Sequence, residues 1–296
     1  MNVVLSSEIG FCFGVKRAVK MTEDLLSEIG KAYVVGSLIH NPLEMKRLSK
    51  KGLISVSSVE EIPPRSAVII RSHGIPKEDK EKLLEMGGRV VDATCPFVRK
   101  VQDIAKDLVK DGYRLLIYGD PKHPEIKGIL SHLGEEALVI HKEEDLDFIS
   151  PSDKIGLVSQ TTQELDAFLK IAATLSTRVD ELRVFNTICD ATIKRRRALL
   201  DLASKSDIII VVGGKNSSNT CKLVELAAKH MKKVYHIESP IEISRRWFEG
   251  VKVLGLASGA STPDWQIRSV LAIIRKYGGE VNNGDNPNAG GNNLSY

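Results

Sequence analysis

The stretch VVDATCPFVRKVQDIAKDL, residues 90–108, places one cysteine between a short apolar strand and an amphipathic helix. Val90 and Val91 favour a strand, and apolar residues spaced three and four apart after Pro96 favour a helix. Pro96 suits the first turn of that helix, where its missing N–H costs nothing. The sequence therefore predicts a strand-to-helix junction at Cys95.

The same plan occurs at two other cysteines. Residues 10–19, GFCFGVKRAV, place Cys12 before a helix, and residues 183–203, RVFNTICDATIKRRRALLDLA, place Cys189 before another. The three cysteines are separated by 83 and 94 residues. Such a long period is typical of repeated domains rather than of a solenoid.

Each repeat also contains two strands that end in polar loops. A strand ending in glycine follows the cysteine helix in residues 33–42, 115–125 and 208–220. A later strand and its polar loop occupy residues 68–76, 155–163 and 253–262. Strands that alternate with helices indicate an α/β fold with parallel sheets, and such sheets bind ligands at the carboxyl ends of their strands. We therefore expect the polar loops and the three cysteines to converge on one centre.

This repeat predicts the domain organisation. We expect three α/β modules at residues 13–95, 96–188 and 189–280, with residues 1–12 completing the third. Residues 281–296 have abundant Asn and Gly and almost no apolar content, which predicts a disordered tail.

Composition narrows the class of protein. Hydrophobic residues make up 42% and charged residues 27%, the mix of a globular protein. A net charge of +4 with 5% aromatic residues gives little support to nucleic-acid binding. We find no apolar run that could span a bilayer and no secretion signal, and so we expect a cytoplasmic protein. Because cytoplasmic thiols stay reduced, four scattered cysteines indicate metal binding or catalysis.

Cys12, Cys95 and Cys189 occupy equivalent positions and are candidate metal ligands. Three thiolates suit either zinc with a fourth ligand or an iron–sulfur cluster with one open iron. The wide separation of the three, without a C-x-x-C pair, fits the cluster better. Cys221 falls outside the repeat, which predicts a packed thiol without a ligand role.

Polar loops supply candidate anion-binding groups. The loop GGKNSSNT, residues 213–220, offers backbone amides, hydroxyls and amide side chains ahead of a helix that the pattern begins at Cys221. A well-capped turn is the alternative for this loop. The loop at residues 258–262 adds hydroxyls. His40, His73 and His123 each lie in a polar loop and could donate to an anionic ligand as cations.

A carboxyl group lies in the same loop as His123. Shielded from bulk water, Glu125 is a candidate proton donor, and a solvated loop carboxylate is the alternative. The sequence SQTT adds amide and hydroxyl groups at Gln160, Thr161 and Thr162. The basic run Lys194–Arg197 is typical of a solvated helix face, with an acidic redox partner as the alternative.

These motifs together resemble one known family. GFCFGVKRAV, LIHNP, RSHG, DATCP, KHPE, SQTT, ICDAT, KNSSNT and GAST occur in order between about residues 9 and 280. The set is similar to that of the LytB-type 4-hydroxy-3-methylbut-2-enyl diphosphate reductases of isoprenoid synthesis. The resemblance implies three α/β modules in a trefoil around a [4Fe-4S] cluster.

The resemblance also implies a role for each matching residue. The cluster ligands would be Cys12, Cys95 and Cys189. Glu125 would deliver protons, and Thr161 would help to position the substrate hydroxyl. The diphosphate would be held by His40, His73, His123, Ser217, Ser218, Asn219 and Ser261.

The reaction implied is a two-electron reductive dehydroxylation of an allylic alcohol diphosphate to isopentenyl and dimethylallyl diphosphate. It would need an external one-electron donor such as ferredoxin or flavodoxin. Two other classes stay open from the residues alone. An iron–sulfur redox sensor would not need six polar loops, and a zinc hydrolase could use the same cysteines with Glu125.

Overall fold

The computed structural model describes residues 1–133 and 137–281 of the 296-residue chain. Thirteen strands in these ranges form three sheets in which every strand pair is parallel. The predicted α/β class with parallel sheets is therefore confirmed. From residue 282 on, the predicted tail lies outside the described residues.

Tertiary contacts divide the chain into two compact units, and each unit is built from more than one segment. Unit 1 consists of Met1–Phe13, His40–Glu44 and the chain from Asp190 onward. Unit 2 consists of Gly14–Ile39 and Met45–Cys189. The module borders expected from the repeat stay a prediction.

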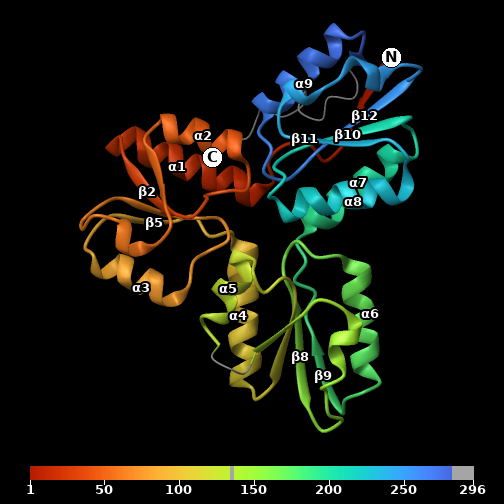
Figure 1. Cartoon of the computed structure of the whole chain (residues 1–296). Coiled ribbons are helices and arrows are strands. Elements are labelled where there is room, and N and C mark those ends of the chain that lie inside the picture. The colour runs from red at the N-terminus through yellow and green to blue at the C-terminus, as the bar shows by residue number, and fades with distance from the viewer. Residues whose placement is uncertain (134–136, 282–296) are drawn as a thin grey trace, which may run out of the picture. The chain divides into compact units, whose positions relative to one another are not determined.

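Unit 1 is built on a five-stranded sheet in the order β11-β10-β12-β1-β13. These strands are β11 (Val234–Ile237), β10 (Ile208–Val212), β12 (Val253–Ser258), β1 (Asn2–Leu5) and β13 (Glu280–Val281). The first strand of the chain thus lies between two strands made from its other end. Helix α9 (Asp264–Lys276) covers one face, and α7 (Asp190–Ala203) and α8 (Ser218–His230) cover the other (Figure 1).

Strand β10 shows why both faces of this sheet are covered. Its side chains alternate between the faces, so Ile208, Ile210 and Val212 pack in the core under α9. Ile209 and Val211 pack in the core under α7 and α8. A strand buried on both sides reads as a continuous apolar run, and this is the pattern IIIVV.

Unit 2 contains two four-stranded sheets. The first has the order β3-β2-β4-β5. Its strands are β3 (Leu53–Val56), β2 (Ala32–Val35), β4 (Val68–Ile70) and β5 (Val90–Asp92). The second has the order β7-β6-β8-β9. Its strands are β7 (Ala137–Ile140), β6 (Arg114–Tyr118), β8 (Lys154–Ser159) and β9 (Glu181–Val184).

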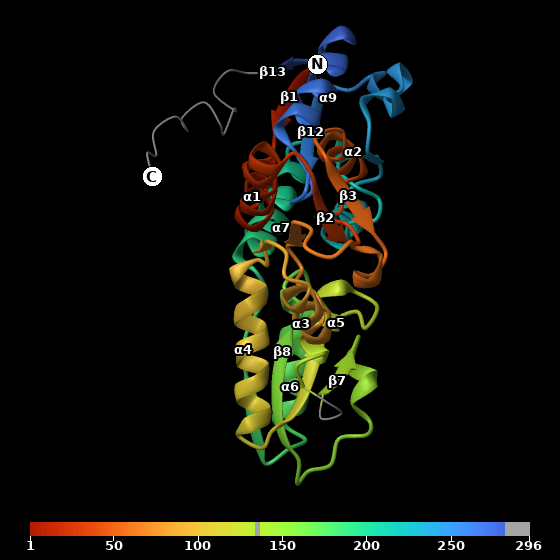
Figure 2. The same cartoon turned by 90° about the vertical axis from the view of Figure 1, so that its left-hand side faces the viewer.

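The helix after Cys95 is α4 (Pro96–Lys110), as the sequence predicts. Val101, Ala105 and Leu108 pack against Leu115 and other residues of β6 and β8. Figure 2 shows α4 running alongside β8. Helix α6 (Leu165–Ser176) lies on the other side of this sheet in Figure 1. Burying one such leucine contributes about 1.5–3 kcal/mol, so these contacts stabilise the packing of α4 on this sheet.

The remaining helices are α1 (Phe13–Ile29), α2 (Pro42–Lys50), α3 (Lys77–Glu85) and α5 (Pro124–Leu130). No helix in the described parts of the chain has both the length and the hydropathy that crossing a bilayer requires.

Candidate active site

Glu125 and Thr161 form a buried pair in unit 2. Glu125 lies in the first turn of α5 and is 1% exposed, and Thr161 follows the end of β8. The Thr161 backbone N–H donates to Glu125 Oε1 and the Thr161 hydroxyl donates to Glu125 Oε2, both at 2.7 Å. These contacts exclude the alternative of a solvated loop carboxylate, because water does not reach this side chain.

Thr161 also connects this pair to a cysteine. Its carbonyl accepts a hydrogen bond from the backbone N–H of Cys189 at 2.9 Å. Two residues earlier in each segment, the Ser159 N–H donates to the Thr187 hydroxyl at 2.7 Å, and that hydroxyl donates to the Ser159 carbonyl at 2.6 Å. The loop after β8 therefore holds the segment that ends at Cys189.

His123 caps helix α5. Its Nδ1 accepts a hydrogen bond from the Glu125 backbone N–H at 3.2 Å. Because Nδ1 accepts in this contact, Nε2 is the ring nitrogen that can act as a donor. The role of His123 as a donor to an anionic ligand stays a prediction. The ring of His73 lies 5.4 Å from that of His123, edge-on at 88°.

A tight turn after β4 positions His73. The Arg71 Nε donates to the Gly74 carbonyl at 3.0 Å, and the Gly74 N–H donates to the Arg71 carbonyl at 3.0 Å. Burial lowers the pKa of Arg71, and the nearby charge of Asp79 opposes this shift in part. The turn thus holds His73 beside His123 by bonds across its own ends.

Gln160 holds the loop that carries His123. Its backbone N–H donates to the Tyr118 carbonyl at 2.9 Å, and its side-chain Oε1 accepts from the Asp120 N–H at 3.0 Å. Its Nε2 donates to the Thr162 hydroxyl at 2.9 Å. The Gln160 side chain is completely buried. Its amide group, a candidate ligand-binding group in the sequence, therefore positions the loop instead.

Cys95 is the N-cap residue of α4, with Pro96 in the first turn as predicted. Its backbone N–H donates to the Ser72 carbonyl at 2.9 Å. A Cβ added at Gly14, near the start of α1, would lie 2.5 Å from the Cys95 sulfur. Only glycine at position 14 leaves space around this thiol, and the sequence alone did not identify that requirement.

Asp92 supports the turn that leads into Cys95. Its Oδ1 accepts from the Thr94 N–H at 3.0 Å, and its Oδ2 lies 2.9 Å from the Lys80 ammonium and 3.1 Å from the Arg99 guanidinium. Burial alone would raise the pKa of Asp92, but the hydrogen bonds from Lys80 and Thr94 outweigh burial and lower it. The carboxylate is therefore held ionised at the start of this turn.

In unit 1, the loop after β10 leads directly into α8. The helix begins at Ser218, so the prediction that it begins at Cys221 is wrong. Ser217 is the N-cap, and its hydroxyl oxygen accepts from the Thr220 N–H at 3.4 Å. The capped turn and the anion site are not exclusive, because a hydroxyl that accepts can still donate its own proton.

Asn219 carries a donor that the protein does not use. The side chain is 8% exposed, and its Nδ2 has no hydrogen-bond partner within the described ranges. A buried amide nitrogen without a partner costs about 1–3 kcal/mol. The first turn of α8 therefore offers Asn219 Nδ2, together with the hydroxyls of Ser217 and Ser218, to a ligand with several acceptor oxygens.

Thr220 fixes this turn against the sheet and was not identified from the sequence. It is fully buried, and a Cβ added at Gly259, just after β12, would collide with its hydroxyl oxygen. The sequence signal that could have revealed this contact is a threonine in the first turn of a helix together with a glycine at the end of a neighbouring strand. Such a pair marks a close approach of backbone and side chain.

The His40 loop and the loop after β12 are joined by hydrogen bonds. The Ser261 hydroxyl donates to the His40 carbonyl at 2.9 Å, and Asn41 Nδ2 donates to the Ser261 carbonyl at 2.9 Å. Asn41 Nδ2 also lies 2.8 Å from Gln266 Oε1, and Asn41 Oδ1 accepts from the Glu44 N–H at 3.0 Å. Asn before a Pro at a helix start was the sequence signal for this cap.

The four cysteines differ in their surroundings. Each is partly exposed, and within residues 1–133 and 137–281 none forms a disulfide. The Cys12 N–H donates to the Ala260 carbonyl at 3.0 Å, which holds it beside the loop after β12. Cys221 lies in α8, and burial together with the charge of Glu225 raises the pKa of its thiol.

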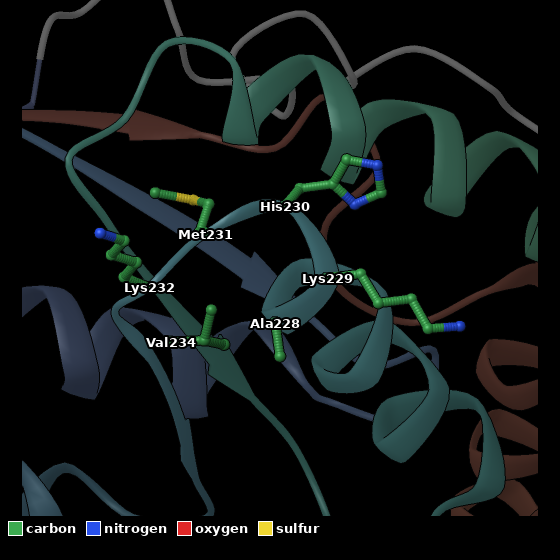
Figure 3. A pocket seen from close by; sticks show the side chains of 6 residues that line it. All are labelled: Ala228, Lys229, His230, Met231, Lys232 and Val234. Carbon is green, nitrogen blue, oxygen red and sulfur yellow. The ribbon is translucent and has the colours of Figure 1, made fainter.

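A pocket lies at the C-terminal end of α8, opposite the first turn of that helix. It is lined by Ala228, Lys229, His230, Met231, Lys232 and Val234. The side chains of Lys229 and Lys232 point away from each other (Figure 3). None of the candidate site residues lines this pocket, and its charged groups do not converge on one point.

Comparison with known proteins identifies the family to which this chain belongs. A family model described as LytB protein matches residues 3–275. The 4-hydroxy-3-methylbut-2-enyl diphosphate reductase of Campylobacter lari is 44% identical over 278 residues, which cover 94% of this chain and 99% of that protein. The protein of the same name from Helicobacter pylori is 44% identical over 275 residues, covering 93% of this chain and 99% of that protein.

Solved structures give the same result. One is a structure of (E)-4-hydroxy-3-methyl-but-2-enyl diphosphate reductase, described as the terminal enzyme of the non-mevalonate pathway. It is 40% identical, covers 93% of this chain and 99% of its own, and superposes with a TM-score of 0.71. The E-1-hydroxy-2-methyl-but-2-enyl-4-diphosphate reductase of Plasmodium falciparum is 26% identical, with a TM-score of 0.86 and coverage of 94% and 91%. The chain belongs to the LytB family.

Proposed function

We propose that this protein reduces (E)-4-hydroxy-3-methylbut-2-enyl diphosphate to isopentenyl diphosphate and dimethylallyl diphosphate, the last step of the non-mevalonate isoprenoid pathway. The observation that carries this proposal is the buried Glu125–Thr161 pair and its hydrogen bond to Cys189. It puts a shielded carboxyl group, a hydroxyl and a cysteine into one small network, inside a chain of the LytB family.

Cys12, Cys95 and Cys189 would hold a [4Fe-4S] cluster in this proposal. The donor set fits such a group, because each thiol lies at or just before the start of a helix and none is in a disulfide within the described residues. Gly14 packs directly against the Cys95 sulfur, where a Cβ would collide with it, so glycine at this position lets the thiol lie where it does. When bound, the cluster would supply electrons one at a time and a Lewis-acidic iron.

The chain's own residues would bind and orient the substrate. Ser217, Ser218 and Asn219 would donate to the diphosphate, with Ser261 and the three loop histidines His40, His73 and His123 adding donors. A diphosphate fits the first turn of α8, where the helix dipole and the buried Asn219 Nδ2 favour an anion rich in oxygen. Thr161 would position the substrate hydroxyl, since its own hydroxyl already points to Glu125.

Glu125 would supply the proton that converts the leaving hydroxyl into water. The reaction consumes two electrons and two protons: one carbon–oxygen bond breaks, water leaves, and a carbon–hydrogen bond forms at either end of the allylic group. An external one-electron donor such as ferredoxin or flavodoxin would supply the electrons. Reduced cysteines are required throughout, and we therefore place the protein in the cytoplasm.

Serine substitutions of the cysteines test the cluster. We expect Cys12→Ser, Cys95→Ser and Cys189→Ser each to lose bound iron and activity, because each removes one of three proposed ligands. Cys221→Ser is the matched control and should retain both. The measurement is iron per chain and turnover after anaerobic purification. Iron retained in Cys95→Ser and lost in Cys221→Ser would show that the ligand assignment is wrong.

Inorganic pyrophosphate tests the anion site separately. We expect it to compete with the substrate in the wild type and about 10- to 100-fold more weakly in Ser218→Ala, the scale of one hydrogen bond to a charged group. Ser204→Ala, at an exposed position just after α7, is the control and should bind pyrophosphate as the wild type does. Equal competition in all three proteins would leave this turn as a helix cap only.

A further inference from the structure

Arg195 is buried although its neighbours in the basic run are not. It lies in the second turn of α7 and is 3% exposed, whereas Lys194 and Arg197 are exposed. The expectation that Lys194–Arg197 forms a solvated helix face is therefore wrong at this residue. Burying a guanidinium is costly unless its N–H groups are bonded, so its partners indicate what the charge is held there to do.

The partners of Arg195 belong to two separate segments of unit 1. Its Nη1 donates to the carbonyls of Glu8 and Ser258, and its Nη2 donates to the carbonyl of Gly10, all at 3.0 Å. Nη1 also lies 3.5 Å from the Ser258 hydroxyl. The guanidinium thus joins the loop after β1 to the end of β12.

Ser258 completes the same connection. Its hydroxyl oxygen accepts from the Gly10 N–H at 2.9 Å and lies 3.2 Å from the Gly259 carbonyl, to which it donates. Gly10 is therefore held through both of its backbone polar groups, with its carbonyl on Arg195 and its N–H on Ser258. Both partners are buried, so neither bond competes with water.

These hydrogen bonds hold the backbone of Gly10, which lies two residues before Cys12. The chain between the end of β1 at Leu5 and the start of α1 at Phe13 forms no regular secondary structure. The path of this loop depends on the hydrogen bonds at Glu8 and Gly10 and on the bond from the Cys12 N–H to the Ala260 carbonyl. By holding this loop, Arg195 therefore helps to determine the position of the Cys12 thiol.

We propose that Arg195 is a positioning residue that holds the Cys12 loop in the conformation required of a metal ligand. Its relevance to the reaction rests on the proposed ligand role of Cys12. The planar, forked guanidinium can donate to three carbonyls from two segments at once, and an ammonium on a lysine stem does not reproduce that geometry. A positive charge without the forked geometry of a guanidinium is thus insufficient to hold the loop at this position.

The test compares Arg195→Lys with Arg197→Lys, the same substitution at an exposed position of the same helix. In metal-free protein, we expect the alkylation rate of Cys12 relative to Cys221 to rise about tenfold in Arg195→Lys, the factor given by losing one hydrogen bond to a charged group. Amide hydrogen exchange at Gly10 and Cys12 should rise with it. Arg197→Lys should match the wild type in both measurements.

A uniform loss of stability would raise the alkylation rates of Cys12 and Cys221 together, since both residues belong to unit 1. An unchanged ratio in Arg195→Lys, or a parallel rise at both thiols, would overturn the proposal. Ser258→Ala covers the case in which Arg195→Lys does not fold. It removes the acceptor for the Gly10 N–H, together with the hydroxyl's bond to the Gly259 carbonyl, and should raise exchange at the Gly10 amide. Unchanged exchange there would also overturn the proposal.

A second measurement concerns the protein loaded with iron. We expect a chelator to bleach the visible absorption of Arg195→Lys faster than that of Arg197→Lys. The alkylation and exchange measurements need no metal, so they test Arg195 even if Cys12 is not a ligand. Failure of the ligand assignment would instead appear as iron retained in Cys12→Ser.

Discussion

At the scale of single residues, Thr161 connects the groups on which the proposed chemistry depends. Its N–H and hydroxyl go to Glu125 and its carbonyl accepts from Cys189. The sequence motifs identified all three residues as candidates. They could not show this connection, because 36 residues separate Glu125 from Thr161 and a motif carries no distance between loops.

Glu125→Gln separates proton supply from geometry. The amide oxygen can still accept from the Thr161 N–H, and the amide NH2 can donate to the Thr161 hydroxyl, so the pair keeps its shape. The amide cannot release a proton. We expect iron content and substrate binding to be retained and turnover to fall by roughly 100-fold or more, the usual scale of general acid catalysis.

Glu143→Gln is the control for that substitution, because Glu143 accepts from the Thr174 hydroxyl at 2.6 Å in a similar but exposed pair. It should turn over at the wild-type rate. Turnover is measured at saturating substrate, and a change in the electron paramagnetic resonance spectrum on adding substrate reports binding. Wild-type turnover in Glu125→Gln would mean that the proton comes from another group.

At the scale of elements, helix starts were predicted best where the signal is local. Pro96 marks the start of α4, and α7 starts directly after Cys189 as expected. The start of α8 was misplaced, because Ser and Asn favour caps and turns as much as first-turn positions. The burial of Arg195 could not be predicted, since its carbonyl partners lie 63 to 187 residues away in sequence.

Gly259→Ala tests how the first turn of α8 is seated. The added methyl group would collide with Thr220, and overpacking of this kind typically costs about 1–3 kcal/mol. We expect the melting temperature to fall in Gly259→Ala and to recover in part in the double variant Gly259→Ala/Thr220→Ala. The two substitutions should therefore be non-additive, as expected of residues in contact.

Gly250→Ala is the control for the added methyl group alone. A Cβ at Gly250 meets nothing within 4 Å, although the positive φ of this residue adds backbone strain of its own. Thr220→Ala should change the melting temperature of Gly250→Ala by the same amount as it changes that of the wild type. Equal effects of Thr220→Ala in the Gly259→Ala and Gly250→Ala backgrounds would contradict the contact.

At the scale of the whole molecule, the repeat predicted three α/β modules with residues 1–12 completing the third, but not that His40–Glu44 belongs to the same unit as residues 1–13. Repeated strands and helices are visible as periodic apolar runs, and the three parallel sheets follow from them. The pairing of Val3 with Leu254 and the assignment of His40–Glu44 to unit 1 depend on contacts between distant segments. Local patterning carries no information about such contacts.

The shared sheet of unit 1 predicts the behaviour of a fragment. Residues 190–281 alone lack β1, whose Val3 is fully buried between β12 and β13, and lack two of the three carbonyls that accept from Arg195. We expect this fragment to show no cooperative urea transition. Residues 1–13 joined to it through a flexible linker should restore one. A transition of equal size in both fragments would show that β1 is dispensable.

The position of β1 also bears on how the nascent chain folds. Asn2–Leu5 is synthesised long before the strand beside which it lies, which begins at Val253. At the usual 5–20 residues per second, about 250 intervening residues take on the order of ten to fifty seconds to synthesise. Throughout that interval an apolar segment has no partner, while the strands of unit 2 are completed. Asn2–Leu5 is therefore synthesised early in the chain but is among its last segments to fold.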